Sequence, residues 1–245
     1  MTSSREQFGK VAQAYAKSWV HARGADLERL AALVPASGTL LDVGTGAGHT
    51  LAAIASKFDR AIGLDPTPQM LAAARGVLRE HDVRAHLVEA DAAALPLAER
   101  SVDVVTSRVA AHHFPDPSSA FREIARVLRP GGTLYLIDNY APEQLSLDSF
   151  INSLERLRDP SHIRAYPLSQ WLALLEAAGF RTRVDFRDRV QLDVEDWLAR
   201  SRTPPNAAAA VRERLRRAPS EAREAFAIEA THFSTYRAVI VANKP

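Results

Sequence analysis

The sequence predicts an α/β fold with a mainly parallel sheet covered by helices on both faces. Between about residue 38 and residue 140, short strand-like apolar runs alternate with longer segments whose apolar residues recur at helical spacing. A loop of alternating glycines follows the first apolar run and directly precedes a helical segment. This alternation is typical of consecutive βαβ units, whose strands are buried on both faces.

The first part of the chain is expected to supply five strands and three helices. Strands are expected at 39–43, 61–64, 85–89, 102–107 and 133–137, and helices at 49–57, 67–79 and 117–128.

Helix starts and stops carry their own signals. Thr67 precedes Pro68 and Asp116 precedes Pro117, so that in each case a capping side chain is followed by a residue that needs no backbone donor. The run 130–132, Pro-Gly-Gly, is expected to end the third helix and turn the chain into the next strand. These signals set the predicted helix limits.

The second part predicts an amphipathic helix, a late pair of strands and a helical segment between them. The helix begins near Ser169 and closes at Gly179, and the strands are expected at 180–192 and 233–241. Residues 194–228 are helical in composition and carry several arginines, which are interleaved with glutamates. This pattern favours a solvated amphipathic face over a binding patch.

Composition excludes several classes of protein. The chain has 245 residues and no cysteine, which excludes a disulfide framework, a thiolate metal site and a cysteine nucleophile. Lys and Arg number 31 against 29 Asp and Glu, so charge gives little support for nucleic acid binding. The sequence has no apolar run long enough for a membrane span and no apolar signal core near Arg5 and Lys10, so we expect a cytoplasmic protein.

The glycine loop at 44–48 indicates a nucleoside site. Glycines allow a left-handed backbone and let a ligand approach closely, because no Cβ stands in the way. A dinucleotide fingerprint counted from Gly44 would need its last glycine at position 49, which is His49. The loop therefore does not favour binding of a nicotinamide dinucleotide.

Acidic residues end three strands in succession. Asp42, just before the loop, could hold the loop amides, face a cation on the ligand, or only brace the loop. Asp65 stands about 20 residues beyond Gly44, where a carboxylate can accept both ribose hydroxyls. Asp91 could accept a hydrogen bond from an adenine amine. A carboxylate-lined site favours an uncharged or cationic nucleoside, a description that S-adenosylmethionine fits.

Five motifs carry a family resemblance. The chain resembles the class I S-adenosylmethionine-dependent methyltransferases, in particular the branch of ubiquinone and menaquinone biosynthesis methyltransferases, through LLDVGTGAGHT at 40–50, GLDPTPQML at 63–71, EADAAALPL at 89–97, SVDVVTSRVAAHHF at 101–114 and REIARVLRPGGTLYLID at 122–138. The resemblance implies a Rossmann-like, mostly parallel sheet of seven strands with an antiparallel last strand.

The resemblance also implies a set of cofactor contacts. The glycine loop would pass against the methionine part of S-adenosylmethionine, Asp65 would bind the ribose, and an apolar pair would flank the adenine. The residues carried over are Gly44, Thr45, Gly46 and Gly48 for the methionine part, Asp65 for the ribose, Pro66 and Met70 for the adenine faces, Asp91 and Ala92 for its edge, and Arg108 for the pocket wall.

The N-terminal segment looks like the helical lid of that family. Tyr15, Ser18 and His21 are spaced by three and would share one helix face, from which they could reach the ligand together. Tyr15 could equally anchor the helix on the core. We interpret residues 1–36 as a lid, 37–192 together with 229–245 as the core, and 193–228 as a helical insertion.

Methyl transfer is an in-line displacement, so the protein chiefly positions two reactants and excludes water. Where the acceptor must lose a proton, His112 and His113 are the candidate bases and His113 is preferred, although His112 could simply pack under the loop that follows. No metal site is expected, because adjacent strand-end histidines point apart. On the acceptor side, Tyr140 and His162 are candidate contacts, and 158–160 resembles a helix end followed by a turn.

These observations favour a methyltransferase that uses S-adenosylmethionine, releases S-adenosylhomocysteine and acts on a small-molecule acceptor. The alternatives are a non-catalytic S-adenosylmethionine-binding protein, an RNA methyltransferase and a nicotinamide-dependent oxidoreductase. The RNA alternative is weak because no stripe of aromatic and basic residues accompanies the arginines at 212–223. We therefore expect no nucleic acid partner.

Overall fold

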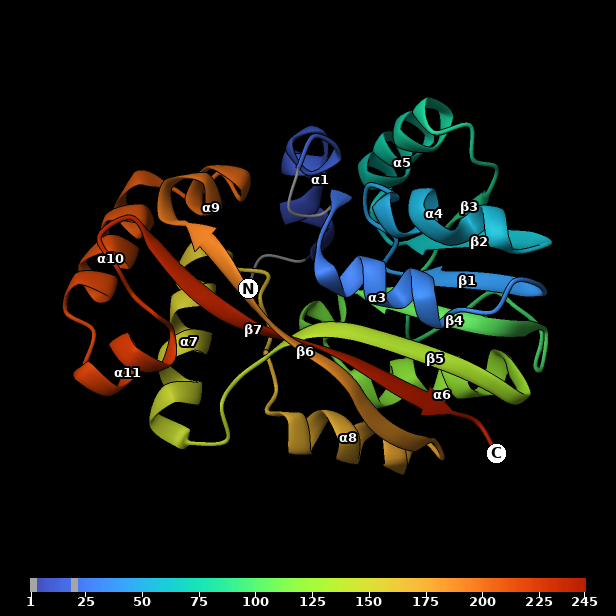
Figure 1. The fold of residues 1–245 in the computed structure, drawn as a ribbon. Helices are drawn as coiled ribbons and strands as arrows, with labels where there is room; N and C mark the ends of the chain where they lie inside the picture. The colour runs from blue at the N-terminus through green and yellow to red at the C-terminus, as the bar shows by residue number, and fades with distance from the viewer. Residues whose placement is uncertain (1–3, 19–21) are drawn as a thin grey trace.

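The computed structural model describes residues 4–18 and 22–245. In this part of the chain, seven strands form one sheet in the order β3-β2-β1-β4-β5-β7-β6 (Figure 1). The strands are β1 (Thr39–Val43), β2 (Arg60–Asp65), β3 (His86–Glu89), β4 (Val102–Arg108), β5 (Leu128–Tyr140), β6 (Arg181–Asp193) and β7 (His232–Asn243). Strand β7 runs antiparallel to both β5 and β6, and the pairs among β1 to β5 are parallel. The predicted sheet with its antiparallel last strand is confirmed.

Helices connect and cover these strands. They are α1 (Ser4–Ala16), α3 (Ala25–Leu33), α4 (His49–Ile54), α5 (Pro68–Glu80), α6 (Pro117–Val127), α7 (Leu145–Arg158), α8 (Leu168–Ala177), α9 (Val194–Arg200), α10 (Pro205–Arg216) and α11 (Ser220–Ala225), with the short 3₁₀ turns η1 (Ala55–Lys57) and η2 (Ala111–His113). The helix predicted at 49–57 is therefore an α-helix that tightens into a 3₁₀ turn after Ile54.

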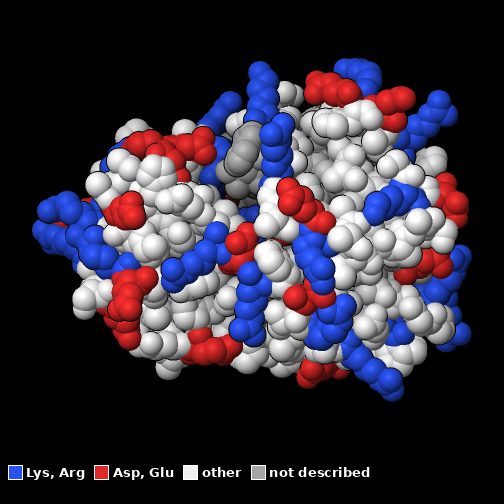
Figure 2. Space-filling view, viewed as in Figure 1, with Lys and Arg blue, Asp and Glu red and all other residues white. Residues whose placement is uncertain are grey.

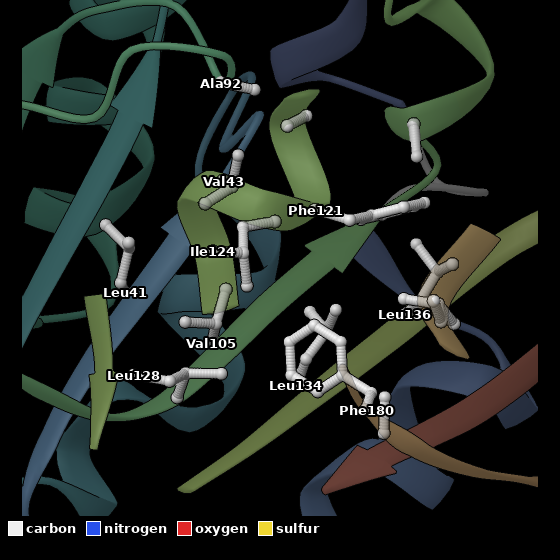
Figure 3. Close-up of a cluster of buried hydrophobic side chains, with 14 of the residues drawn as sticks. Leu41, Val43, Ala92, Val105, Phe121, Ile124, Leu128, Leu134, Leu136 and Phe180 are labelled. Carbon is white, nitrogen blue, oxygen red and sulfur yellow. The ribbon is translucent and has the colours of Figure 1, made fainter. Parts of the chain in front are cut away.

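Alternate residues of each central strand face opposite layers. On one face, Leu41 and Val105 belong to the core built with Phe121 and Ile124 of α6, and Figure 3 shows these side chains gathered around that helix. On the other face, Leu40 packs into a separate core with residues of α3 and α4. Burial on both faces explains the nearly continuous apolar runs of these strands.

The two predicted helix caps turn out differently. Asp116 accepts a hydrogen bond from the backbone N–H of Ser119 at 3.0 Å, so it caps α6 as predicted. Thr67 stands at the N-cap position of α5, but its side chain makes no capping bond. Its hydroxyl and its backbone N–H are instead both bound to Asp65, the backbone bond being 2.8 Å. The Thr67 capping prediction was wrong because a stronger local acceptor competes for the hydroxyl.

The third helix ends within one residue of the predicted position, but the prediction that the Pro-Gly-Gly run ends it was wrong. Helix α6 ends at Val127, and Leu128 already has extended backbone and pairs with Val102 as the first residue of β5. The Pro-Gly-Gly run at 130–132 lies inside this strand, at an irregularity of the β4 and β5 pairing. Gly132 is required there because a Cβ would lie 2.9 Å from the carbonyl oxygen of Asp103.

Strands β6 and β7 run past the sheet into a second group of helices, α7 and α9 to α11, which we call the helical lobe (Figure 1). The lobe has its own core, which includes Phe150, Trp197, Val211, Phe226 and Phe233. The segment 193–228 supplies three of the helices in this lobe.

The charged surface of the helical lobe is mixed in sign, as Figure 2 shows for one face. Arg212 contacts both carboxylate oxygens of Glu195 at 2.7 Å, and Glu213 pairs with Arg216 and Arg217. These pairs agree with the solvated amphipathic face expected from the sequence. Among the helices of residues 4–18 and 22–245, none is long and apolar enough to cross a membrane.

Candidate functional site

A cavity of about 700 Å³ lies at the carboxyl ends of β1 to β4, with α1 as a further wall. Open parallel sheets bind their ligands at this edge. Most of the predicted site residues line the cavity, namely Tyr15, Gly44, Thr45, Gly46, Asp65, Pro66, Met70, Asp91, Ala92, Arg108 and His113. Ser18, Asp42, Gly48 and His112 are not on its wall, and His21 lies outside the described residues.

The glycine loop leaves the end of β1 with left-handed backbone at Gly44 and Gly46, whose φ angles are 71° and 51°. A Cβ at Gly44 would lie 2.6 Å from the Cβ of Ala110, so only glycine fits there. A Cβ at Gly46 would meet no atom within 4 Å. Backbone N–H groups of Gly44 and Thr45 donate to the carbonyl of Leu64, which ties the loop to β2. The loop therefore presents bare backbone to the cavity.

Gly48 has a packing role. Its φ angle is 84°, and a Cβ there would lie 3.1 Å from the Cβ of Ala74 in α5. The missing side chain lets the start of α4 approach α5 closely. The predicted contact of Gly48 with a ligand has no counterpart on the cavity wall.

Asp42 lies behind the loop. Its Oδ2 accepts a hydrogen bond from Thr45 Oγ1, and its Oδ1 accepts one from Thr106 Oγ1, both at 2.7 Å. Complete burial raises the pKa of Asp42 to about 6, against the opposing effect of the two hydroxyls. Of the roles left open by the sequence, bracing the loop fits this geometry, and facing a ligand does not.

Asp65 joins the loop to the cavity. Its Oδ2 accepts the backbone N–H of Gly46 at 2.9 Å and its Oδ1 accepts that of Thr67 at 2.8 Å. Burial raises the pKa of Asp65, and these hydrogen bonds oppose the rise. Asp91, at the next strand tip, is exposed and accepts the N–H of Ala93 at 2.8 Å. Two carboxylates thus border the cavity at neighbouring strand ends.

Arg108 is fixed by a buried ion network that the sequence did not reveal. Its Nε and Nη2 donate to the two oxygens of Asp26, at 2.6 and 3.2 Å, and Arg237 Nη1 donates to the same carboxylate at 3.3 Å. Burial pushes the pKa of Asp26 upward, but the charges of Arg237 and Arg108 hold it below its ordinary value. Because these residues come from distant parts of the chain, no spacing could indicate that they meet.

The two adjacent histidines have different surroundings. His112 is buried, and its Nδ1 lies 2.5 Å from Asp138 Oδ1. Burial opposes its protonation, but the charge of Asp138 raises the pKa of His112 overall. His113 lines the cavity, with its ring 4.2 Å from that of His112 and edge-on to Phe8 at 4.9 Å. Burial and the neighbouring charge of His112 lower the pKa of His113 to about 4.

A turn at 159–162 supports His113, a contact that the sequence did not indicate. His113 Nδ1 lies 3.1 Å from the carbonyl oxygen of Ser161. Asp159 Oδ1 accepts hydrogen bonds from the backbone N–H and the hydroxyl of Ser161, at 2.9 and 2.6 Å. Helix α7 ends at Arg158, so the predicted helix end followed by a turn is confirmed.

The other two acceptor-side candidates do not line the cavity. Tyr140 stacks on Tyr236 with ring centroids 5.4 Å apart. His162 is buried, with Nε2 2.9 Å from Asn152 Oδ1. Within the described part of the chain, no group of three or more His, Cys, Asp or Glu side chains could hold a metal ion.

Helix α1 contributes residues that sequence reasoning missed. Phe8 lines the cavity and contacts Tyr15 edge-on, with ring centroids 5.5 Å apart. Arg5 forms a 2.7 Å ion pair with Glu89 at the tip of β3. His49 Nε2 lies 2.9 Å from the backbone oxygen of Tyr15. The helix is thus attached to both sides of the cavity, which its apolar spacing alone could not indicate.

Comparison with known proteins shows that the chain is similar to methyltransferases in both sequence and structure. Residues 41–136 match the methyltransferase domain family. The chain is 38% identical over 224 residues to the uncharacterized methyltransferase YcgJ of Bacillus subtilis, covering 90% of this chain and 88% of that one. The crystal structure of YcgJ superposes with a TM-score of 0.85, at 34% identity and with 89% and 97% of the two chains covered.

Two further relatives show how names vary among similar sequences. The uncharacterized protein YafE of Escherichia coli is 36% identical over 150 residues, which are 61% of this chain and 72% of that one. A malonyl-[acyl-carrier protein] O-methyltransferase from a Marinomonas species is 33% identical over 177 residues, which are 70% of this chain and 63% of that protein.

Proposed function

Since the chain belongs to the class I S-adenosylmethionine-dependent methyltransferases, we propose that it transfers the methyl group of S-adenosylmethionine to a small-molecule acceptor in the cavity at the carboxyl edge of the sheet. A methyltransferase requires a methyl acceptor, and the cavity is a site in which one could meet the cofactor. The ubiquinone-like branch of the family has only loose support from these relatives.

The main support for the proposed cofactor site is the hydrogen bond between Asp65 and the glycine loop, both of which line the cavity. The carboxylate of Asp65 and the bare backbone of Gly46 lie on one cavity wall, 2.9 Å apart. Carboxylates suit ribose hydroxyls, and backbone without a Cβ allows close approach of an uncharged nucleoside. Pro66 and Met70 offer apolar contacts for a purine ring beside them. The residues therefore fit adenosine better than a phosphate-bearing ligand.

When bound, S-adenosylmethionine supplies an activated methyl group on its sulfonium centre. The protein's part is to orient the acceptor and to exclude water, which contributes up to about 7–11 kcal/mol in well-oriented reactions. Phe8 and Tyr15 of α1 provide an aromatic wall for this purpose. The ion network around Arg108 holds the wall beyond β4 in place.

His113 is the proposed base for an acceptor that must lose a proton. The Ser161 carbonyl only accepts hydrogen bonds, and the Ser161 hydroxyl, 3.3 Å from the same ring nitrogen, donates to Asp159 Oδ1 at 2.6 Å, so we assign the hydrogen to His113 Nδ1. In the neutral ring, Nε2 is then left as a proton acceptor. Because the pKa of His113 lies near 4, the ring is neutral at pH 7 and Nε2 is free of a proton, but the same low pKa makes it a weak base that suits an acceptor which loses its proton easily. His112, held by Asp138, is a positioning residue in this arrangement.

The protonation of the two histidines can be checked by NMR titration of their imidazole rings. We expect His113 to titrate near pH 4 and to be protonated at Nδ1 when neutral. In His112→Gln the pKa of His113 should rise, because a positive charge 4.2 Å away no longer opposes its protonation. An unaltered His113 pKa in this variant, or titration of wild-type His113 near 6.5, would count against the proposed arrangement.

Calorimetric titration with S-adenosylmethionine, S-adenosylhomocysteine and NADH tests the cofactor site directly. We expect both adenosyl ligands to bind and NADH not to bind. Asp65→Ala should weaken binding by about tenfold or more, because a charge-assisted hydrogen bond is lost. Asp65→Asn keeps one acceptor oxygen, which can serve the N–H of Gly46 or that of Thr67 but not both, so chemical denaturation of each variant is measured beside its affinity to separate loop support from ligand contact. A folded wild-type protein that binds neither adenosyl ligand would refute the proposal.

The competing functions predict other results. A non-catalytic binding protein would bind S-adenosylhomocysteine, but it would not convert S-adenosylmethionine to S-adenosylhomocysteine with any acceptor tested. An RNA methyltransferase would bind RNA in a salt-dependent manner. The surface arginines Arg212, Arg216 and Arg217 pair with glutamates, which supports the small-molecule proposal over the RNA alternative.

A further inference from the structure

A second polar cluster lies behind Tyr15, where α1, the end of α7 and the end of α9 meet. Tyr15 lines the cavity, and its hydroxyl is 3.5 Å from Nη2 of Arg158. Gln7 of α1 donates to the backbone oxygen of Ser201 at 2.8 Å, just after α9. These contacts connect three segments that are far apart in the sequence.

Arg158 is fully engaged with protein groups. Its Nε donates to the carbonyl of Trp197 at 3.0 Å, and its guanidinium lies 4.8 Å from the centre of the Trp197 ring. Its Nη1 contacts Glu155 Oε2 at 3.4 Å, so a buried carboxylate offsets its charge. Arg158 is therefore a fixed positive charge at the edge of this cluster.

Arg200 is less well compensated. Its side chain is only 9% exposed, and its Nε has no hydrogen-bond partner among the described residues. The carboxylate that pairs with it, Asp196, is 61% exposed and lies 3.4 Å away without forming a hydrogen bond. Burial, together with the charge of Arg158, lowers the pKa of Arg200. A buried guanidinium with an unused donor costs free energy unless an anion satisfies it.

Two further buried atoms in this region lack a hydrogen-bond partner among the described residues, Ser201 Oγ and Asp159 Oδ2. Ser201 follows Arg200 directly, and its hydroxyl can donate to the same ligand. Asp159 is a carboxylate and would repel an anion placed beside it, so the Arg200 side of the cluster is the side suited to negative charge. Glu155 also acts electrostatically on Arg200, and burial raises the pKa of Glu155.

We propose that Arg200 and Ser201, with Arg158 beside them, form a subsite for an oxyanion carried by the methyl acceptor, either a carboxylate or a phosphate. We call these three residues the oxyanion subsite. A guanidinium suits such groups because its planar donors match two oxygens at once. Tyr15 connects this subsite to the main cavity, because it lines that cavity and its hydroxyl lies 3.5 Å from Arg158 Nη2. This inference rests on the proposed methyl transfer, because it assigns the class of acceptor to that same site.

The test is an NMR titration of the ¹⁵N-labelled full-length protein saturated with S-adenosylhomocysteine. Inorganic phosphate is added at constant ionic strength while the arginine Nε–Hε resonances are followed, with Arg200 assigned through Arg200→Lys. We expect a saturable shift at Arg200 and none at Arg212, whose Nε is already bound to Glu195. A parallel titration with acetate distinguishes a carboxylate site from a phosphate site.

Ser201→Ala retains the Arg200 resonance and should weaken anion binding by about tenfold or more. Ser56→Ala, at an exposed position in η1, serves as the matched control and should leave the affinity unchanged. An Arg200 shift no larger than that of Arg212 with either anion, or equal affinities in Ser201→Ala and wild type, would overturn the subsite.

Failure of the inference is distinguishable from failure of the proposed function. Binding of S-adenosylhomocysteine is measured first, and the anion titrations are run with and without it. If the adenosyl ligand binds and neither anion moves Arg200, only the oxyanion subsite is rejected. If the adenosyl ligand does not bind, the proposed cofactor site is rejected whatever the anions do.

Discussion

Carboxylates at the ends of β1 and β2 have different tasks because their exposure to the cavity differs. Asp42 gives both oxygens to threonine hydroxyls behind the glycine loop. Asp65 gives its oxygens to backbone N–H groups and lies on the cavity wall. Asp42 holds the loop in shape, and Asp65 both holds the loop and faces the cavity. The sequence predicts carboxylates at both strand ends, but only the fold decides which of them lines the cavity.

The raised pKa of Asp42 predicts a pH-dependent loss of stability. The folded state binds a proton more tightly than the unfolded chain, with pKa values of about 6 against 3.8. The stabilisation of the folded state by protonated Asp42 is therefore fully present below pH 3.8 and is lost as the pH rises through 6, a change of about 3 kcal/mol in the free energy of unfolding. Asparagine does not titrate, so Asp42→Asn lacks this pH-dependent loss. Between pH 4 and pH 7, the free energy of unfolding of wild type should fall by about 3 kcal/mol more than that of Asp42→Asn.

Urea denaturation at pH 4 and pH 7 measures this difference. Glu99→Gln, at an exposed position, is the control and should keep the wild-type pH dependence. Identical pH dependences in Asp42→Asn and wild type would mean that Asp42 is not protonated more readily in the folded state.

At the scale of the element, α5 and α6 begin in the same way in the sequence but not in the structure. Both have a capping residue followed by proline, yet only Asp116 bonds to its own helix. Thr67 donates hydrogen bonds from its backbone N–H and its hydroxyl to Asp65, two residues earlier, whose buried oxygens accept them. The start of α5 is thereby joined to the cavity, while the start of α6 depends on its cap.

Removing the cap of α6 should be measurable. Asp116→Ala deletes the acceptor for the Ser119 N–H and hydroxyl, at 3.0 and 2.5 Å, and should lower the free energy of unfolding by about 1 kcal/mol. Chemical denaturation of this variant is compared with that of Ser118→Ala, in the first turn of the same helix, which should change stability by less than about 0.5 kcal/mol. Equal effects from the two substitutions would show that Asp116 does not stabilise the helix start.

At the scale of the whole molecule, β6 and β7 join two hydrophobic cores. Near its start, β7 places Phe233 in the core of the helical lobe, and further along it places Val239 and Ile240 in the two cores that flank the sheet. Strand β6 pairs with β7 along this length, with a register shift between Val184 and Phe186. Because the strands are continuous, the sheet and the lobe are expected to unfold together.

Phe226→Ala tests this coupling. Phe226 is fully buried and contacts Phe150 and Tyr236, with ring centroids 5.8 Å away in each case. Its truncation should cost about 3–5 kcal/mol and shift a single unfolding transition, as should truncation of Phe121 in the core of the sheet. Circular dichroism gives the transition, and hydrogen exchange compares amides of α10 and α6. Early exchange confined to α10 in Phe226→Ala would show that the lobe unfolds independently.

The sequence by itself determined the layered α/β fold, the order of its strands along the chain and the edge of the sheet at which the cavity lies, because hydrophobic period, glycine spacing and strand-end carboxylates are local signals. Tertiary structure decided what those signals could not. It placed Asp42 and Gly48 behind the cavity wall, joined Arg108 to Asp26 and Arg237, and brought Arg158 near Arg200. Contacts between residues far apart in the chain depend on packing and burial, which leave no regular spacing in the sequence.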